Sequence, residues 1–580
     1  MAETATLQVW DYVVIVLMLL TSTAIGIYYR FTGGRQKTSE EYYVANRTMG
    51  ATPVAIGLMV SFLSAISLLG VSSENYVYGT QYAAVNVGYV IATPFAAYLY
   101  LPVFFKLQAT SAYEYLERRF GSVSRTVASF GFSIQLLLYT GIVLYAPALA
   151  LEATTGLSKT ASVVSIGLVC TLYSSVGGIK AVLITDVFQS LLMLIAVVTI
   201  IVTAAIDVGS IGEIWRIADA GNRIEFDSIS VDPTVRHTWW SLTIGGFFTY
   251  LSLYGVNQVQ VQRLLTINNL KSAQISLWWS LPIACVMSLT TCLSGLAIYS
   301  KYHDCDPRTS GRIGSVDQLM PLYVMDTLSD IPGLPGLFIA GIFSAGLSSV
   351  SATLNSLSAV ILEDYVKPCY RWRNKEFPAS KFAIVGKALA LLVGLLCIVV
   401  AFLAQYLGGV LQAALTIFGV VGGPILGLFT LGMFTECATQ RGAVTGILIS
   451  LMFCLWIGFG QPKPAAPTLP VSVAGCNSTS SYDSSVTSNV TRAQSTGDSS
   501  DFYLYRISYM WYCPLGFLTS TIFGLIASYL LRFIFKEETV ELDPDLLVPF
   551  LASRLRKRRE KARDVNGSEF GSKHELNTYS

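Results

Sequence analysis

The chain has 580 residues, of which 53% are hydrophobic and only 13% are charged, whereas about a quarter of the residues of a typical soluble protein are charged. The mean hydropathy is +0.56, and apolar runs recur along nearly the whole chain. This composition indicates an all-α polytopic membrane protein and excludes disordered, collagen-like and small disulfide-rich proteins. The formal net charge of +2 argues against nucleic-acid binding.

Recurrent apolar stretches predict the membrane helices. A bilayer core about 30 Å thick needs roughly 20 apolar residues in a helix, and about thirteen stretches of the chain meet this requirement. We expect transmembrane helices at 10–29, 51–72, 83–105, 128–150, 161–179, 183–207, 239–261, 275–299, 335–362, 383–406, 411–434, 443–461 and 511–533. The first stretch does not resemble a signal peptide, because it begins with Glu3 and Asp11 and lacks a basic start.

Lysine and arginine residues predict the orientation. They gather in alternate connections and in the C-terminal tail, and connections of this kind are cytoplasmic in most membrane proteins. They are Arg30, Arg35, Lys37, Arg47, Lys106, Arg118, Arg119, Arg125, Lys180, Arg263, Lys271, Lys367, Arg371, Arg373, Lys375, Lys381, Arg441, Arg554, Arg556, Lys557, Arg558, Arg559, Lys561 and Arg563. With an odd number of spans, the N-terminus of the first helical segment (1–30) is expected outside and the tail 536–580 in the cytoplasm.

A long Ser/Thr-rich loop supports this orientation. The segment 462–510 separates the last two helices of the region 435–535 and carries N-glycosylation sequons at Asn477 and Asn489. Glycans are attached only on the lumen-derived side of a membrane, and the charge pattern independently puts this loop outside. We therefore predict that both asparagines are glycosylated.

The same topology applies to two further sequons and two cysteines. Asn46 and Asn566 begin sequons that fall on the predicted cytoplasmic side, so we expect them to stay unmodified. Cys305 and Cys476 both lie in outer loops. They either form a disulfide or are two free thiols.

Enzyme motifs are missing from the sequence. It contains no P-loop, no HExxH and no G-x-S-x-G after a strand. Three histidines offer little material for acid–base catalysis, and the ten cysteines are too scattered to predict a metal cluster. We expect neither an enzyme nor a bound cofactor.

Two expected membrane helices contain residues that interrupt helices. Residues 61–70 read SFLSAISLLG, and residues 408–432 contain several glycines and Pro424. A helix that unwinds within the membrane frees carbonyl oxygens, which is tolerated only where they line a cavity or meet an ion. The alternatives are close packing of small residues in the first segment and a simple kink in the second.

Hydroxyl groups form a stripe on the ninth expected helix. Ser344, Ser348, Ser351 and Asn355 follow at i, i+4, i+7 and i+11, which is one helical face. Sodium is a hard cation that prefers oxygen ligands. The adjacent hydroxyls of Ser348 and Ser349, with carbonyls freed in a broken partner helix, would supply them without a fixed charge. Close packing of small residues is again the alternative.

Polar residues within spans are functional candidates. Asp186 stands at the cytoplasmic start of the sixth span, where it either pairs with Lys180 or belongs to an ion path. Asn257 and Gln258 either contact a polar solute or join helices. No lysine or arginine is clearly expected at mid-membrane, so an anionic solute would rely on helix N-termini, hydroxyl groups and bound sodium.

Several segments together resemble the sodium/solute symporter family, closest to its monocarboxylate, multivitamin and iodide carriers. The resemblance covers residues 8–535. It is carried by 110–120 (TSAYEYLERRF), 138–149 (LYTGIVLYAPAL), 185–189 (TDVFQ), 254–263 (YGVNQVQVQR) and 332–338 (PGLPGLF), while 302–307 (YHDCDP) and 475–479 (GCNST) are most similar to monocarboxylate members.

The resemblance implies a leucine-transporter-type core of two inverted five-helix repeats, 51–207 and 239–434, with a sodium site between the second and ninth spans. Its implied sodium ligands are the carbonyls of Leu63, Ile66 and Ala345 and the hydroxyls of Ser348 and Ser349. It also implies an inner ion path at Asp186 and a substrate cavity at Ser67, Tyr139, Tyr250, Asn257 and Leu415. Ser67 and Leu415 replace the Gln and Phe of iodide carriers, which weakens an iodide assignment.

These features lead to one leading functional hypothesis. The chain is expected to be a plasma-membrane symporter that couples sodium entry to the import of a small organic anion of the monocarboxylate type, by alternating access. Its partners would be sodium, the solute and the lipid bilayer, with no nucleic acid. The alternatives are transport of biotin or pantothenate, transport of iodide, and a solute-gated channel or membrane receptor built on the same fold.

Overall fold

The structure is a single helical bundle. The computed structural model describes residues 7–32, 39–108, 110–176, 178–378, 381–406, 409–464, 466–476, 502–535 and 542–561, which contain no β-strand. The long helices are α1 (Val9–Phe31), α3 (Ala51–Phe62), α4 (Ala65–Tyr78), α5 (Val85–Phe95), α8 (Ser122–Thr155), α9 (Lys159–Val176), α10 (Ile179–Val208), α12 (Trp239–Leu251), α14 (Leu270–Tyr302), α16 (Leu334–Ile361), α18 (Phe382–Ala404), α20 (Gly423–Phe434), α21 (Gln440–Phe459) and α22 (Tyr512–Phe535).

Shorter helices connect or extend these. They are α2 (Ser39–Val44), α6 (Leu101–Leu107), α7 (Glu114–Arg119), α11 (Ile211–Ala220), α13 (Gln258–Leu264), α15 (Leu319–Leu328), α17 (Lys367–Trp372) and α19 (Val410–Ile417). Four π-helical turns, η3 (Ala96–Tyr100), η4 (Ser252–Val256), η6 (Leu362–Val366) and η8 (Phe418–Gly422), lie within longer helical runs. A final helix over 549–561 follows the 3-10 turn η11 (Pro544–Leu546).

The predicted spans all fall largely on helices, but they differ in continuity. In the described part of the chain, 10 helices are long and apolar enough to cross a membrane, and the bent pair α3 and α4 makes an eleventh span. The predicted span 161–179 falls on α9, whose apolar part, Lys159–Leu172, is shorter than the helices that are long enough to cross a membrane. The span 239–261 is divided between α12, η4 and α13. Counting apolar residues cannot detect such interruptions, so it yields the higher number.

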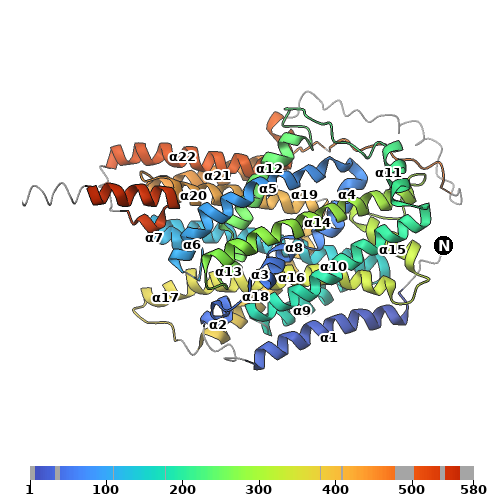
Figure 1. The fold of residues 1–580 in the computed structure, drawn as a ribbon, viewed down its shortest axis with the longest axis horizontal. Helices are drawn as coiled ribbons and strands as arrows, with labels where there is room; N and C mark the ends of the chain where they lie inside the picture. The colour runs from blue at the N-terminus through green and yellow to red at the C-terminus, as the bar shows by residue number, and fades with distance from the viewer. Residues whose placement is uncertain are drawn as a thin grey trace, which may run out of the picture.

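Burial separates a central helix from the edges of the bundle. Helix α16 is almost completely buried from Phe338 to Val360, whereas α1 and α22, at opposite edges of the bundle (Figure 1), expose large apolar side chains such as Leu17 and Phe533. Exposed apolar surface of this extent is stable only in contact with lipid. The sequence pattern and the structure therefore agree on a membrane domain with α16 at its centre.

Two interruptions occur where the sequence contains helix-weakening residues. Between α3 and α4 the chain bends by 56°, and Leu63 and Ser64 have extended backbone angles. The predicted Gly- and Pro-rich kink is the π-helical turn η8, after which α20 begins with Gly423 and Pro424. A third interruption, which the sequence does not predict, lies at Asn257 between η4 and α13.

A disulfide connects two of the loops that the sequence predicts to be outside. Cys305 and Cys476 are bonded to one another, and two backbone hydrogen bonds continue the contact, from Asp306 N to Ser472 O at 2.8 Å and from Gly475 N to Asp304 O at 2.9 Å. The predicted glycosylation sites Asn477 and Asn489 lie outside the described residues, as does the sequon at Asn566.

Removing this disulfide should loosen the outer loops and leave the helices in place. Removal of a native disulfide typically costs about 2–5 kcal/mol in small domains, so Cys476→Ser should raise amide exchange in 466–476 about tenfold or more. Hydrogen–deuterium exchange measures this, and Cys369→Ser, at an exposed free cysteine, is the matched control. Unchanged exchange in 466–476 would show that the hydrogen bonds alone hold the contact.

Candidate functional site

The interruption in the first broken helix leaves backbone oxygens without helical partners. Helix α3 ends at Phe62, and Leu63 (φ −86°, ψ 92°) and Ser64 (φ −91°, ψ −177°) leave the helical region before α4 starts. The last carbonyls of a helix have no N–H partner within it. The Ser64 hydroxyl caps α4 by accepting a hydrogen bond from Ile66 N at 3.2 Å. Carbonyl oxygens therefore collect at this point in the middle of the bundle.

The stripe of serines on α16 faces this region, and its two adjacent hydroxyls differ. Helix α16 packs against both α3 and α4, and Ala345, Ser348 and Ser349 are all buried. The Ser349 hydroxyl has no hydrogen-bond partner among the described residues, which is costly for a buried polar group unless a ligand completes it. The Ser348 hydroxyl instead donates to Asp186 Oδ1. The Ser349 hydroxyl is thus available as a sodium ligand in this structure, whereas the Ser348 hydroxyl is already hydrogen-bonded to Asp186.

The Ser348 contact belongs to a buried ion pair that the sequence does not reveal. Arg263 Nη1 donates to Asp186 Oδ2 at 2.5 Å, and both side chains are fully buried. The predicted alternative, a pair between Asp186 and Lys180, is wrong, because the Lys180 ammonium lies 5.7 Å from the centre of the Tyr29 ring. The assignment of Arg263 to a cytoplasmic loop is wrong too, since it is part of α13 in the interior.

Glycine allows the pair to approach α3. A methyl group added at Gly57 would lie 2.6 Å from Arg263 Nη1 and 3.3 Å from Asp186 Oδ2. The ion pair therefore fills the space next to the α3 backbone, one helical turn before the interruption. Loss of one partner of a buried ion pair typically costs about 3–5 kcal/mol, because the other charge is left uncompensated.

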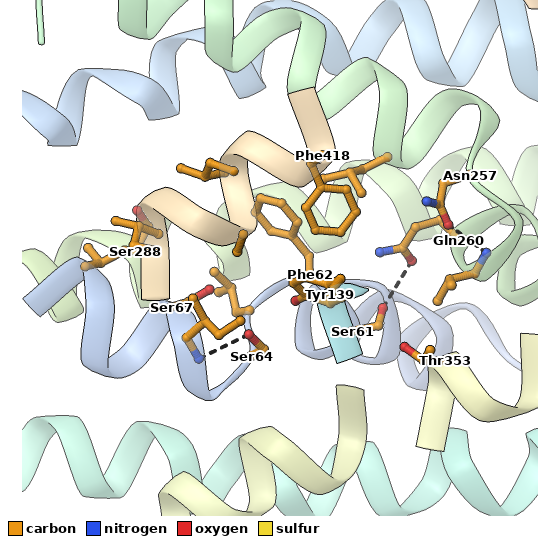
Figure 2. Close-up of a pocket in the computed structure, with 18 of the residues that line it drawn as sticks. Ser61, Phe62, Ser64, Ser67, Tyr139, Asn257, Gln260, Ser288, Thr353 and Phe418 are labelled. Carbon is orange, nitrogen blue, oxygen red and sulfur yellow. Dashed lines mark hydrogen bonds between the residues drawn. The ribbon is translucent and has the colours of Figure 1, made fainter. Parts of the chain in front are cut away.

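A central cavity of about 70 Å³ lies beside the interruption (Figure 2). Its polar lining residues are Ser61, Ser64, Ser67, Tyr82, Tyr89, Tyr139, Asn257, Gln260, Ser288, Thr291 and Thr353, and its apolar lining residues are Phe62, Leu63, Ile66, Val71, Leu136, Leu253, Val259, Leu411, Ala414, Leu415 and Phe418. Figure 2 shows Ser67 and Ser288 on one side of Phe62 and Phe418, with Asn257, Gln260 and Thr353 on the other. The aromatic rings thus separate two polar ends.

Four of the five predicted cavity residues line this space. They are Ser67, Tyr139, Asn257 and Leu415. The fifth, Tyr250, was expected to line or support the cavity and is not in its lining: its ring stacks on Tyr254 with centroids 4.1 Å apart and lies 5.3 Å from Tyr89, which does line the cavity. Tyr250 therefore supports the wall from behind. The sequence analysis missed Ser61, Gln260 and Thr353, which are ordinary polar residues without a distinctive spacing.

None of the described lining residues is a carboxylate, a lysine or an arginine. Polar contacts within the wall are few: the Ser61 hydroxyl lies 3.2 Å from Gln260 Oε1, and Gln260 Nε2 donates to Leu58 O at 3.1 Å. The first residues of α4 lie in the wall, so the positive end of that helix dipole points at the cavity. An anion and a cation could compensate one another here, whereas either alone would lack a partner.

A second and larger cavity of about 630 Å³ lies beyond the first. Its charged lining residues are Glu74, Glu152, Lys159, Arg236, Arg308 and Asp317. Leu411 lines both cavities, and it packs so closely on α4 that a methyl group at Gly70 would lie 2.7 Å from Leu411 Cβ. This cavity is bordered by the loops that the sequence predicts to be outside, so we call it the vestibule, and Leu411 separates it from the central cavity.

Hydrogen bonds connect α4 to α19 across the vestibule. Arg236 donates to Glu74 Oε1 at 2.6 Å and to Gln412 Oε1 at 2.8 Å. His237 lies 3.1 Å from Glu74 Oε1, and burial lowers the pKa of this histidine. Asp317 Oδ2 accepts a hydrogen bond from Val410 N, the first residue of α19, at 3.2 Å. The helix that carries Leu411 is thus held at its start by two polar contacts.

The opposite end of the bundle is closed by a different ion cluster. Arg125 pairs with both Asp364 and Glu117, which connects α8, η6 and α7. Arg119 donates to Gly432 O at 3.1 Å and to Thr435 O at 2.8 Å. This packed end, which is predicted to be the inner one, therefore lies across the bundle from the vestibule.

Comparison with known proteins assigns the family. The model of the sodium:solute symporter family matches residues 42–450. A Drosophila melanogaster protein, provisionally assigned as a sodium-dependent multivitamin transporter, is 51% identical over 98% of this chain and 96% of its own length. Sodium-coupled monocarboxylate transporter 1 of Homo sapiens is 41% identical over 90% and 87%, and the sodium-dependent multivitamin transporter of Oryctolagus cuniculus is 40% identical over 91% and 83%.

Among solved structures, a Na+-coupled sialic acid symporter in a substrate-bound outward-open state matches with a TM-score of 0.75 at 24% identity, over 90% of this chain and 98% of its own. Interrupted helices around a central cavity in this fold define a membrane transporter of the leucine-transporter class. The chain belongs to the sodium:solute symporter family, and it is a transporter rather than an enzyme.

The unpartnered hydroxyl predicts which serine matters most for sodium. Ser349→Ala should raise the sodium concentration for half-maximal uptake about tenfold, equivalent to about 1.4 kcal/mol, because it removes an oxygen that no protein group uses. Ser351→Ala is the matched control, since its hydroxyl donates back to Ser348 O within the helix. Sodium-dependent uptake in membrane vesicles measures both. Equal sodium dependence in the two variants would contradict the site.

The vestibule predicts a pH dependence through Asp317. Burial raises the pKa of Asp317 to about 6. The protonated, neutral carboxyl group is therefore favoured in the state in which Asp317 is buried against α19. This closed state gains stability as the pH falls through about 6. Acidifying the outside from about 7.5 to about 5.5 should then slow uptake about two- to fivefold. In the Asp317→Asn variant, this pH-dependent decrease in uptake should disappear. Uptake of pyruvate measures it, because the carboxyl group of pyruvate stays ionised over this pH range. If uptake by the variant still decreased on acidification, a group other than Asp317 would cause the pH effect.

Proposed function

We propose that this chain is a plasma-membrane symporter that imports a small organic anion of the monocarboxylate type together with sodium. The observation that carries the proposal is the uncharged central cavity at the interrupted helix, together with a buried Ser349 hydroxyl that has no partner among the described residues, on a helix that packs against both halves of the interrupted one. A cavity without fixed charge suits the joint transport of an anion and a cation, because each compensates the other once water is excluded.

The proposed sodium ligands are the carbonyls of Leu63, Ile66 and Ala345 and the hydroxyl of Ser349. Ser348 would join them when its hydroxyl turns away from Asp186. This exchange makes the Ser348–Asp186 hydrogen bond a connection between the sodium site and the inner side. Asp186 would then act on the path by which the ion leaves.

The proposed anion partners are the start of α4, the hydroxyl groups of the cavity and the sodium ion. Ser67 lies in the first turn of α4 and lines the cavity. With about 70 Å³ of free volume, this state has far less room than the roughly 300–1,000 Å³ of pockets for drug-sized ligands. The small volume favours a short carboxylate.

The proposed mechanism is alternating access by two inverted repeats, 51–207 and 239–434. Its support is that the first helix of each repeat is interrupted, at Leu63 in one and at Asn257 in the other. Movement of Leu411 would open the vestibule to the cavity, and separation of Arg125 from Asp364 would open the inner end. Each net positive charge that enters gains about 2.3 kcal/mol per 100 mV.

The proposed orientation has the N-terminus outside and the tail 536–580 in the cytoplasm. It is supported by the lysine and arginine pattern and by the disulfide between Cys305 and Cys476, since disulfides persist in oxidising compartments. Glycosylation of Asn477 and Asn489 is part of the same proposal.

A vitamin carboxylate is the second candidate, because the Drosophila melanogaster and Oryctolagus cuniculus relatives are assigned to multivitamin transport. Biotin and pantothenate also carry one carboxylate, which could use the same helix start. Iodide is disfavoured by Ser67 and Leu415. A channel or receptor on this fold would differ by sodium-independent current, or by solute binding without uptake.

The deciding experiment is sodium-driven uptake of labelled pyruvate by the purified chain in proteoliposomes, with competitors. We expect lactate, nicotinate and butyrate to compete and biotin not to compete, and uptake to vanish when choline replaces sodium. Competition by biotin and pantothenate alone would favour vitamin transport. Uptake that persists in choline would overturn symport.

A further inference from the structure

After α22, the segment 542–561 returns to the end of the bundle where α20 ends. Residues 546–548 are buried there. Tyr115 of α7 donates to Leu546 O at 3.1 Å, and Val548 N donates to Met433 O of α20 at 3.1 Å. Since Met433 and Phe434 are the last residues of a membrane-spanning helix, these contacts hold the chain at the level where that span ends.

The helix over 549–561 begins at this point, and one of its faces is turned to the protein. Ala552 is buried and Leu551 and Leu555 are half-buried, while the exposed Phe550, at the start of the helix, has its ring 6.3 Å from the Phe434 ring. Arg558 pairs with Glu436 at 3.3 Å. The helix is therefore docked against the end of α20 at this end of the bundle (Figure 1).

The opposite face is strongly basic and has no acidic partner. Arg554, Lys557 and Lys561 are exposed and follow at i, i+3 and i+7, which places them on one side of the helix. Within the described ranges none of the three lies in an ion pair. Arg556 and Arg558, by contrast, pair with Asp545 and Glu436. Three cations thus face outward together, on a helix whose position is fixed by other contacts.

We propose that this face binds anionic lipid headgroups of the cytoplasmic leaflet. The inference rests on the proposed orientation, which puts the tail on the side of the membrane where anionic lipids are enriched. A basic helix held next to the end of a membrane span is the arrangement that such headgroups attract. Lipid binding here would also hold 546–548 against α7 and α20, and so stabilise the closed inner end that Arg119 and Arg125 maintain.

The test uses the full chain in neutral detergent and a fluorescent phosphatidylserine, with fluorescent phosphatidylcholine as the neutral probe. The variant is Arg554→Gln/Lys557→Gln/Lys561→Gln. The control, Arg371→Gln/Arg373→Gln/Lys375→Gln, removes the same charge from exposed positions near α17, in the connection to α18 on the same predicted side. Each variant is compared with the unmodified chain at low and raised salt.

We expect phosphatidylserine to bind more tightly than phosphatidylcholine, the tail variant to lose affinity about tenfold or more, and the control to change less than about twofold. Equal losses in both variants, or equal binding of the two lipids, would overturn the proposal. Stronger binding of polyglutamate than of phosphatidylserine would indicate an acidic protein partner instead. Because binding is measured without sodium or solute, a failure of the proposed transport function leaves this result unaffected.

Discussion

The structure depends on one constraint: backbone polar groups inside a membrane need partners, so a helix can be interrupted only where protein surrounds it. The interruption between α3 and α4 meets this condition. Tyr254 and Gln260 donate hydrogen bonds to Leu58 O from the second interrupted helix, each at 3.1 Å, and the buried face of α16 covers the other side. The extended backbone at Leu63 and Ser64 interrupts the helical hydrogen-bond pattern here, and the proposed sodium site uses carbonyl oxygens of this segment together with the Ser349 hydroxyl. The same constraint that makes the break rare makes it suitable for holding a dehydrated ion.

The buried ion pair of Arg263 and Asp186 lies next to this region. It lies against Gly57 on α3 and holds the Ser348 hydroxyl on α16, so three helices share one charge network. Removing one charged group from a network buried this deeply is strongly destabilising, because the remaining charge is left uncompensated. Any movement that releases Ser348 must therefore be compensated, and a sodium ion that takes up the hydroxyl is a physically suitable trigger.

Sequence reasoning predicted the helical architecture, the interruption near Leu63 and the residues around the cavity, because each has a local signature in spacing or composition. It failed where the outcome depends on tertiary packing. Arg263 follows a run of amides and was counted as a loop charge, since nothing local reveals that Asp186, far away in the sequence, receives it. The sequence could not distinguish lining from supporting the cavity at Tyr250, and two identical letters do not reveal that Ser348 is hydrogen-bonded to Asp186 while Ser349 has no partner among the described residues. The interruption at Asn257 was missed because no proline marks it, and the amides that follow were read only as possible solute contacts or helix contacts.

The most direct test of the ion site is a high-resolution structure of the chain in sodium, compared with one in choline. The site described above requires density for a bound ion between the interrupted backbone at Leu63 and the Ser349 hydroxyl in sodium only, with Ser348 either turned toward it or still bonded to Asp186. A continuous helix through residues 61–70, or a Ser349 hydroxyl that contacts lipid or another side chain in both conditions, would contradict it.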